Sequence, residues 1–485
     1  HNEKHIYCMK LETSNNTKIV ATMGPASWHK DVMKDMIVAG VNVFRVNFSH
    51  GDHETHRRTI RLVKELNSEF NCKTAVLADL QGPKLRIGDV EEGAVINEGD
   101  TLTFTTNKVE GTAELVYMNY QKFPQDVNTG EHILLDDGKL MCEVLETNKK
   151  DTVVTKVIQG GPLKSKKGVN LPNTKVSLPC LTEKDLKDVV VAMEEGVEWI
   201  GLSFVRDADD VNELRKIIND FGSFAKIVSK IEKPEAVVDI DKIIDATDAI
   251  MVARGDLGVE IPYSSVPMVQ KMIVEKCHLK AKPCIIATQM MESMIDSQSP
   301  TRAEVNDVAN SVCDGADAVM LSGETSVGKF PAKVVETMAN IVAHVESTFD
   351  VRPNIENEPS VKNERYITKT ICYNAAKIAD QIDAAAILTM TFSGYTALKI
   401  AGHRPKTKII VFTANRQIMN QMSLVWGVEA FFYDKMESTD QSFRDIKAIL
   451  KESGTVKGGD LIVNIASMPI QERGFTNMLK ISAID

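Results

Sequence analysis

Eight short apolar runs of β type recur between residues 18 and 324, and most of them precede an amphipathic helical pattern. Near-continuous apolar runs are typical of parallel strands that are covered on both faces. Eight such β-α units predict a (β/α)₈ (TIM) barrel, whose functional side chains lie at the carboxyl ends of the strands. The runs cover residues 18–24, 42–48, 74–82, 199–205, 226–232, 249–255, 283–290 and 318–324, and one of the expected helices covers 235–245.

A long segment of different texture interrupts this pattern after the third run. Residues 84–177 alternate polar and apolar side chains and turn on Gly and Asp, as antiparallel hairpins do. They predict an inserted β-barrel-like domain on the catalytic face, placed to act as a lid.

A polar, proline-bearing stretch follows Arg352, and a second α/β alternation begins at Arg365, with strands expected at 384–390, 408–414 and 460–466. We therefore expect an N-terminal segment (1–16), a barrel (17–83 and 178–350), a lid (84–177) and a C-terminal open-sheet α/β domain (351–485) with a regulatory or oligomerisation role. The chain begins with His1, so residues 1–8 are native or derived from a tag, and the fold prediction leaves them out.

Charge and cysteine usage narrow the class of protein. The net charge of −10 argues against general binding to nucleic acid or membranes, and no run approaches the roughly 20 apolar residues that span a bilayer. Eight cysteines without a CxxC pair are typical of reduced thiols, which predicts a cytoplasmic protein.

Charged residues close several of the predicted strands. Lys230 and Glu232 lie two residues apart, so an extended strand places both on one face. Other strand ends carry Arg45, Asp79, Arg254-Gly255-Asp256, Thr288-Gln289 and Ser322-Gly323-Glu324. Strand ends in a barrel converge, so we expect a single constellation.

Each candidate has a functional and a structural interpretation. Glu232 and Asp256, on adjacent strands, suit Mg²⁺, but each can instead pair with Lys230 or Arg254. Arg45 and Lys230 suit a phosphoryl group, or salt bridges to nearby acids.

Three further features stay open in the same way. Gly255 and Asp256 begin either a short helix that receives a carboxylate or a plain strand-ending turn. Lys167, with Lys164 and Lys166, belongs to a basic loop that meets nucleotide phosphates or is simply solvated. His50 alone is most often a turn or core histidine.

Long motifs of this chain resemble those of the pyruvate kinase family. They are RVNFSHG (45–51), SKIE (229–232), IMVARGDLGVEIP (250–262), ATQMMESM (287–294), PTRAEVNDVAN (300–310) and DAVMLSGETSVGKFP (317–331). Their order and spacing match the family, as do the lid and the C-terminal domain. The resemblance runs from about Lys18 to the C-terminus and weakens after Arg352.

The resemblance implies phosphoryl transfer from phosphoenolpyruvate to ADP, giving pyruvate and ATP, with Mg²⁺ or Mn²⁺. It implies that Lys230 stabilises the charge that passes to the enolate and that Glu232 and Asp256 bind the metal. Gly255 and Asp256 would receive the substrate carboxylate. The remaining roles fall to Arg45 on the phosphoryl group, Thr288 in a water relay to the methylene carbon, and Asn47, Ser49, His50, Arg86 and Lys167 on the nucleotide phosphates.

One departure from the family concerns K⁺. Members that need K⁺ read DTKGPEIR where this chain has DLQGPKLR at 79–86. A monovalent-cation site would use Asn47, Ser49, Asp79 and Leu80, but Lys84 replaces a glutamate. We expect the ammonium of Lys84 to supply the missing charge, so that K⁺ is not required.

A second departure concerns regulation. TMTFSGYTA (389–397) resembles the family's effector phosphate loop, with Thr391, Ser393, Gly394 and Thr396 placed to cup a phosphate. Tyr395 stands where Lys or Arg is common, and Pro469 and Ile470 replace a Trp and an Arg of some members. Activation by fructose bisphosphate is therefore not expected, which leaves a sugar monophosphate, a nucleotide or no allosteric effector. The family usually forms homotetramers.

Two rival functions are weighed against this one. A Mg²⁺-dependent barrel aldolase or mutase would explain Glu232 and Asp256, but not the lid with Lys167. A non-catalytic scaffold predicts eroded charges at the strand ends, which this chain retains.

Overall fold

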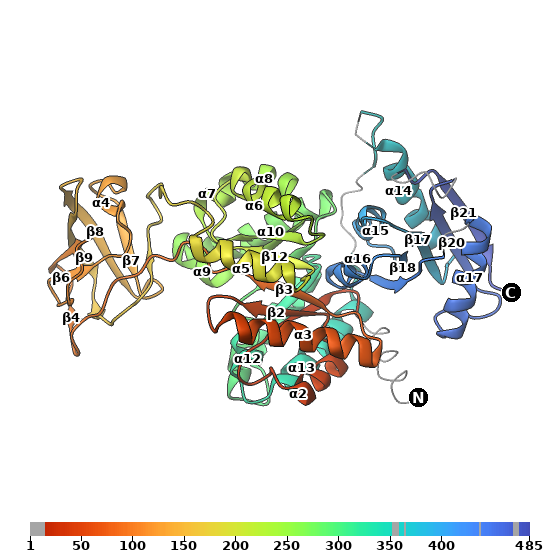
Figure 1. The fold of residues 1–485 in the computed structure, drawn as a ribbon, viewed down its shortest axis with the longest axis horizontal. Coiled ribbons are helices and arrows are strands. Elements are labelled where there is room, and N and C mark those ends of the chain that lie inside the picture. Colours follow the sequence, from red (N-terminus) through yellow and green to blue (C-terminus); the bar gives the residue numbers. More distant parts are fainter. Residues whose placement is uncertain (1–14, 352–357, 363–364, 436–437, 469–474) are drawn as a thin grey trace.

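The computed structural model describes residues 15–351, 358–362, 365–435, 438–468 and 475–485. The lid lies at one end of the molecule, the barrel in the middle and the C-terminal domain at the other end (Figure 1). None of the described helices is long and apolar enough to cross a membrane. Residues 1–14, which hold most of the expected N-terminal segment, lie outside the described residues, as do Pro469 and Ile470.

The predicted (β/α)₈ barrel is confirmed. Eight parallel strands close in the order β1-β16-β15-β14-β13-β12-β3-β2. They are β1 (Lys18–Thr22), β2 (Val43–Asn47), β3 (Ala75–Asp79), β12 (Trp199–Leu202), β13 (Lys226–Ile231), β14 (Ala249–Ala253), β15 (Cys284–Ala287) and β16 (Ala318–Leu321).

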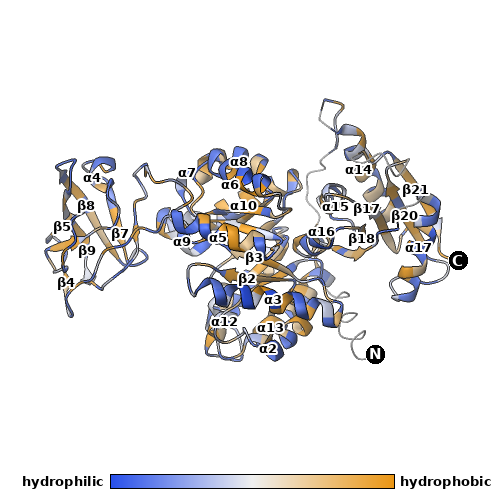
Figure 2. Cartoon of the chain, viewed as in Figure 1, coloured by the Kyte–Doolittle hydropathy of each residue, from blue (hydrophilic) through white to orange (hydrophobic). Residues whose placement is uncertain are grey.

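Alternate side chains of each strand belong to two different cores. In β1, Ile19 and Ala21 pack in the core between strands and helices, whereas Val20 points into the barrel interior. This alternation follows from the period of two in a strand. Because both cores exclude water, the strands read as unbroken apolar runs, and the polar faces of the covering helices turn outward (Figure 2).

The covering helices follow the strands in chain order. They are α2 (Lys30–Ala39), α3 (His53–Phe70), α5 (Glu183–Glu194), α6 (Ala208–Phe221), α7 (Pro234–Val238), α8 (Ile240–Ala246), α9 (Arg254–Glu260), α10 (Val266–Leu279), α11 (Arg302–Cys313), α12 (Gly323–Ser326) and α13 (Pro331–Thr348). The helix expected over 235–245 is two helices, α7 and α8. Asp239 separates them with a non-helical ψ of 17°, and its backbone N–H donates to the Glu235 carbonyl at the end of α7.

The inserted domain is a curled sheet of six strands in the order β11-β7-β8-β9-β5-β6, with a separate β10-β4 pair. Its strands are β4 (Val95–Ile96), β5 (Thr101–Thr105), β6 (Leu115–Tyr117), β7 (His132–Leu135), β8 (Leu140–Thr147), β9 (Thr152–Gln159), β10 (Gly161–Pro162) and β11 (Val169–Asn170), with helix α4 (Phe123–Asp126). It leaves and rejoins the barrel at the carboxyl end of β3, so it lies on the face where the site was predicted.

The C-terminal domain is an open five-stranded sheet in the order β19-β18-β17-β20-β21. Its elements are α14 (Tyr366–Gln381), β17 (Ala386–Met390), α15 (Tyr395–Ala401), β18 (Lys408–Thr413), α16 (Arg416–Gln421), the 3₁₀ turn η3 (Met422–Leu424), β19 (Val428–Phe432), α17 (Thr439–Glu452), β20 (Leu461–Ala466) and β21 (Met478–Ala483). The sequence predicted three of these strands. It missed β19 and the antiparallel edge strand β21, which are largely half-buried or exposed and lack a continuous apolar run.

The C-terminal domain docks against the amino-terminal end of the barrel, opposite the lid. Leu424 is fully buried in the barrel interior beside Val20 and Trp199. Around it, Ser423 donates a hydrogen bond to the Lys73 carbonyl, and Lys18 Nζ donates to the Val428 carbonyl at 3.0 Å. The core of the barrel interior thus contains side chains from both the barrel and the C-terminal domain.

The remaining cores are separate. One spans Ile87 to Leu171 within the inserted segment, and the larger of the C-terminal cores spans Cys372 to Ile465. The buried residues of these two cores lie in the lid and in the C-terminal domain respectively.

Candidate active site

Lys230 lies at the centre of the strand ends. Its Nζ is 3.3 Å from Asp79 Oδ1 and 3.2 Å from Glu232 Oε1, and it donates to Ser203 Oγ at 3.0 Å. Three different strand ends, β3, β12 and β13, supply these oxygens. The side chain is 11% exposed, so the ammonium is held inside the barrel mouth rather than in solvent.

Arg45 approaches the same carboxylate from β2. Its Nε and Nη2 both lie 2.7 Å from Asp79 Oδ2, and its Nη1 donates to Thr22 Oγ1 at 3.0 Å. Burial alone would raise the pKa of Asp79, but the charges of Lys230 and Arg45 lower it below its usual value. Asp79 is therefore an anion that fixes two cations side by side.

Opposite charges also govern Lys230 and Glu232. Burial would lower the pKa of Lys230, but Asp79 and Glu232 raise it, so the lysine is an ammonium. Burial raises the pKa of Glu232, Lys230 opposes this shift, and the charge of Asp256 adds to it. The sequence left two interpretations of these residues open, and the structure combines them. The two cations form salt bridges with their acids, and all of these residues converge on one site.

The donor set of this site fits a hard divalent cation. Glu232 is 1% exposed and close enough to Asp256 for the two charges to repel, a repulsion that a bound cation would relieve. The described residues contain no group of three or more His, Cys, Asp and Glu side chains arranged for a metal. Two carboxylates suit Mg²⁺, which takes its remaining ligands from substrate and water.

A short helix does begin at Arg254, as one of the open interpretations required. The Gly255 N–H donates to Thr288 Oγ1 at 2.7 Å, and a Cβ at Gly255 would lie 3.3 Å from that oxygen. Thr288 itself has φ of +72°, a rare conformation for a β-branched residue, and Gln289 follows at +56°. Such backbone strain is concentrated at functional sites.

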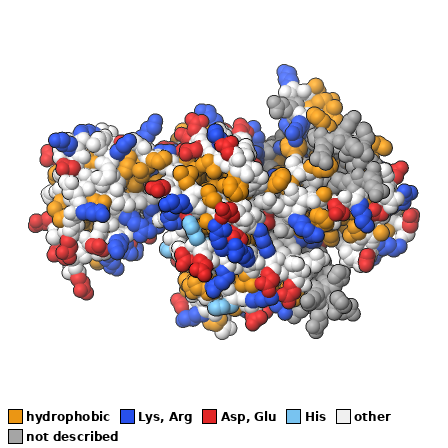
Figure 3. All heavy atoms as spheres, in the orientation of Figure 1, with side chains coloured by type: hydrophobic (Ala, Val, Ile, Leu, Met, Phe, Trp, Pro, Cys, Tyr) orange, Lys and Arg blue, Asp and Glu red, His pale blue; other side chains and the backbone are white. Residues whose placement is uncertain are grey.

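The lid and the barrel border a concave surface between them, here called the notch (Figure 3). The residues predicted to contact the nucleotide come from both domains. Asn47 ends β2 on the barrel, Ser49 and His50 follow it, and the Ser49 N–H donates to Asn47 Oδ1 at 3.1 Å. On the lid, Arg86 donates to the Lys166 carbonyl and Lys167 Nζ lies 3.6 Å from Asp136. Figure 3 shows Lys and Arg side chains on both sides of this notch.

Lys84 lies where the chain leaves the barrel for the lid. It lines a cavity with Asp256 and Asp137, and burial and the charge of Arg86 lower its pKa. Leu80, four residues earlier, is buried, and its carbonyl accepts from Ser203 Oγ at 2.6 Å. The Lys84 charge is thus felt at the proposed metal carboxylate.

The predicted effector loop forms a small cavity of about 50 Å³ in the C-terminal domain. Thr391 Oγ1 accepts from the Gly394 N–H at 2.8 Å, Ser393 and Thr396 line the cavity, and Gly394 has φ of +84° before α15. Arg365, the residue before α14, lines the same cavity, and its guanidinium lies 4.5 Å above the Tyr395 ring.

Sequence reasoning missed Ser203, Asp307 and the Phe204 N–H. Ser203 contacts Lys230 and Leu80, Asp307 forms a two-pronged ion pair with Arg254, and the Phe204 N–H donates to Glu232 at 2.6 Å. Ser203 directly follows β12, so the strand-end rule applied to the fourth strand would have found it. Asp307 lies on α11, away from any strand end, and carries no such signal.

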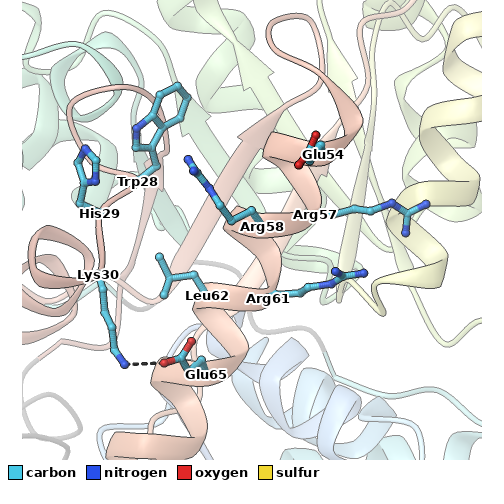
Figure 4. Close-up of a pocket in the computed structure, with 9 residues that line it drawn as sticks. All are labelled: Trp28, His29, Lys30, Glu54, Arg57, Arg58, Arg61, Leu62 and Glu65. Carbon is cyan, nitrogen blue, oxygen red and sulfur yellow. Dashed lines mark hydrogen bonds and ion pairs between the residues drawn. The ribbon is translucent and has the colours of Figure 1, made fainter.

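A second hollow, of about 710 Å³, lies outside the barrel between the start of α2 and α3 (Figure 4). Lys30 pairs with Glu65 there, and Arg57 and Arg61 point away from Trp28 and bond acids of the α5 end. Arg58 lies 6.0 Å above the Trp28 ring. These contacts join α3 to the start of α2 and to the end of α5.

Comparison with known proteins gives one consistent result. The family model of the pyruvate kinase barrel domain matches residues 14–335, and that of the pyruvate kinase alpha/beta domain matches 369–482. A pyruvate kinase from Geobacillus stearothermophilus is 43% identical over 471 residues, spanning 96% of this chain and 80% of the relative. One from Mycobacterium tuberculosis is 41% identical over 468 residues, spanning 96% and 98%. A crystal structure of a pyruvate kinase from Cryptosporidium parvum superposes with a TM-score of 0.90 at 34% identity, covering 98% of this chain and 97% of that one. The chain therefore belongs to the pyruvate kinase family.

Proposed function

We propose that this chain transfers the phosphoryl group of phosphoenolpyruvate to ADP, giving pyruvate and ATP, with Mg²⁺ or Mn²⁺ as cofactor. The observation that carries the proposal is the buried Lys230 ammonium, held by Asp79, Glu232 and Ser203 at the barrel mouth beside Arg45. Family membership supports the same reaction.

In the proposed reaction, an oxygen of the ADP β-phosphate bonds to phosphorus while the bond from phosphorus to the enol oxygen breaks. Negative charge passes to the enol oxygen, and the fixed charges of Lys230 and Arg45 stabilise it without having to reorient. A divalent cation held by Glu232 and Asp256 would neutralise charge on the substrate oxygens. The enolate then gains a proton at its methylene carbon, and we assign Thr288 to the water relay that delivers it.

The substrate carboxylate is proposed to bind at the start of α9. In this structure the Gly255 N–H is taken by Thr288 Oγ1. A carboxylate that accepted this N–H, together with that of Asp256, would free an acceptor position on the Thr288 hydroxyl for a relay water, while the Thr288 O–H donates to the Ala287 carbonyl at 2.6 Å. Substrate binding and readiness for proton transfer would then be linked.

The nucleotide is proposed to bind in the notch, with its phosphates between Asn47, Ser49 and His50 on the barrel and Arg86 and Lys167 on the lid. A binding site divided between two domains is completed only when the lid closes, which also excludes water.

We propose that K⁺ is not required. Of the four residues that would bind it, three have an oxygen that already accepts a hydrogen bond from the chain: Asp79 from Arg45, Leu80 from Ser203, and Asn47 from Ser49. The ammonium of Lys84 lies in the same cavity as Asp256 and interacts with its charge. We propose that this ammonium supplies the positive charge that K⁺ would otherwise bring.

The loop of Thr391, Ser393, Gly394 and Thr396 is proposed to bind the phosphate of a sugar monophosphate or nucleotide effector, with Arg365 as its cation. Titrating such effectors against the phosphoenolpyruvate saturation curve tests this role, and an unchanged curve with every effector would contradict it.

Assembly and location complete the proposal. The exposed apolar side chains of Val238, Tyr263 and Met268 support burial in a homotetramer, which light scattering would measure. The described cysteines are all free thiols, in keeping with a cytoplasmic location.

The first experiment is the rate of pyruvate formation from phosphoenolpyruvate and ADP with Mg²⁺ in K⁺-free buffer. Turnover that requires ADP supports the kinase and the absence of a K⁺ requirement. Turnover only after K⁺ is added would keep the kinase and remove the K⁺ proposal. No turnover in either buffer would favour an aldolase, a mutase or a scaffold.

A further inference from the structure

A side-chain hydrogen bond joins the lid sheet to α9. Asn170, in β11 of the lid, donates from Nδ2 to Glu260 Oε1 on the barrel at 2.8 Å. Nearby, the lid turn at Gly138 lies against Val259 of the same helix, because a Cβ at Gly138 would be 3.6 Å from Val259 Cγ1. The lid therefore rests on the last turn of α9.

Glu260 is a buried carboxylate and not an ordinary surface acid. Its side chain is 3% exposed, and Lys233 Nζ, itself 10% exposed at the side chain, lies 3.7 Å from Oε1. Among the described residues, Glu260 Oε2 has no hydrogen-bond partner. Burying an incompletely paired carboxylate costs free energy, so its presence at a domain boundary calls for a function.

Glu260 and Lys233 lie in the two segments that carry the proposed metal ligands. Asp256 and Glu260 belong to the same seven-residue helix, one turn apart, and Lys233 directly follows Glu232. Asn170, Lys233, Asp256 and Glu260 line one cavity of about 80 Å³. On the lid side, Asn170 lies three residues after Lys167, the lysine proposed to meet the nucleotide.

We propose that Asn170, Glu260 and Lys233 form a latch that sets the position of the lid on the barrel. Asn170 and Glu260 are then positioning residues: they bring Lys167 to the nucleotide without contacting the reacting atoms. The inference rests on the proposed phosphoryl transfer to ADP.

The test is Asn170→Ala in the full-length chain, with two readouts. The KM for ADP should rise about tenfold with kcat little changed, because a mispositioned Lys167 weakens binding of ADP in ground state and transition state alike. Amide hydrogen exchange should become faster in the two lid connections, 84–85 and 176–178, since the lid opens more often. Asn170→Asp places a second carboxylate against Glu260 and should have the larger effect.

Asn128→Ala is the matched control. Asn128 also donates from Nδ2 to a glutamate oxygen at 2.8 Å, that of Glu131, but both residues lie within the lid. It should leave the KM for ADP and the exchange of the connections unchanged.

The outcomes separate the latch from the proposed function. Unchanged exchange and an unchanged KM for ADP in Asn170→Ala would overturn the latch, as would equal changes in the Asn128 control. If Asn170→Ala does not fold, Glu260→Gln, which keeps an oxygen for Asn170 but loses the charge facing Lys233, serves instead, and an unchanged KM for ADP together with unchanged exchange would again overturn the latch. Wild-type protein without ADP-dependent turnover would refute the function, while the exchange readout would still report on the latch.

Discussion

Asp79 is the residue on which both cations of the site depend. It is 1% exposed, and it contacts Arg45 at 2.7 Å and Lys230 at 3.3 Å. Two like charges can lie side by side in a barrel mouth only if an anion is fixed between them. The family resemblance places Asp79 in any monovalent-cation site, and in the structure Arg45 and Lys230 contact its two oxygens.

The first prediction at this scale is for Lys230→Met. Turnover of phosphoenolpyruvate should fall roughly 10²–10³-fold, because a preorganised charge at the transferring group is lost. The rate is measured with saturating substrates and Mg²⁺, and circular dichroism checks the fold. Lys108→Met, a change at an exposed lid lysine outside the basic loop, is the control. Wild-type turnover in the Lys230 variant would contradict the role of the Lys230 ammonium, on which the proposed function rests.

The second prediction concerns Lys84→Glu. The substitution removes the cation whose charge reaches Asp256, so turnover in K⁺-free buffer should fall at least about tenfold. Added K⁺ should restore most of it, as for the family members that carry glutamate at this position. A variant equally active with and without K⁺ would show that Lys84 does not replace the ion.

At the scale of elements, prediction succeeded where burial on two faces leaves a clear sequence pattern. Every barrel strand lies within its predicted run, since inner and outer side chains must both be apolar. The exposed edge strand β21 has no such pattern, and the break at Asp239 depends on local backbone geometry. Contacts between elements, such as Asn170 with Glu260 or Asp307 with Arg254, depend on the folded arrangement and leave no trace in spacing.

His278, in the last turn of α10, supports a prediction about how the free energy of unfolding depends on pH. Burial and the charge of Arg404 lower the pKa of His278 to about 3, and an unfolded histidine has a pKa of about 6.5. Between these values the unfolded chain binds a proton that the folded chain does not. The stability from His278 is complete above about pH 6.5 and falls on acidification by up to about 1.4 kcal/mol per pH unit.

The measurement is urea unfolding of wild type and His278→Gln at pH 7 and pH 5. The wild type should lose up to about 2 kcal/mol more than the variant over this interval. His344→Gln, a change at an exposed histidine, should behave like the wild type. Parallel losses in the wild type and His278→Gln would contradict the assignment.

At the scale of the whole molecule, the barrel and the C-terminal domain share a core through Leu424. Leu424→Ala should lower the free energy of unfolding by about 3 kcal/mol, the typical cost of a buried leucine truncation. Because Leu424 joins the two domains, they should unfold together in the wild type, and tryptophan fluorescence and circular dichroism should report one transition. In the variant the two domains should unfold separately and give two transitions.

Leu461→Ala is the control, because Leu461 is 38% exposed in the C-terminal sheet. It should change the free energy of unfolding far less and leave the transitions coupled. Separate transitions already present in the wild type would show that the shared core does not couple the domains.

The position of Leu424 also has a consequence for synthesis on the ribosome. The last barrel strand ends at Leu321, but the side chain that fills the interior beside Trp199 is made about a hundred residues later. At roughly 5–20 residues per second, the nascent barrel waits on the order of ten seconds with its amino-terminal end open. Chaperones that shield apolar surface would find their binding site on this chain at that end and during that interval.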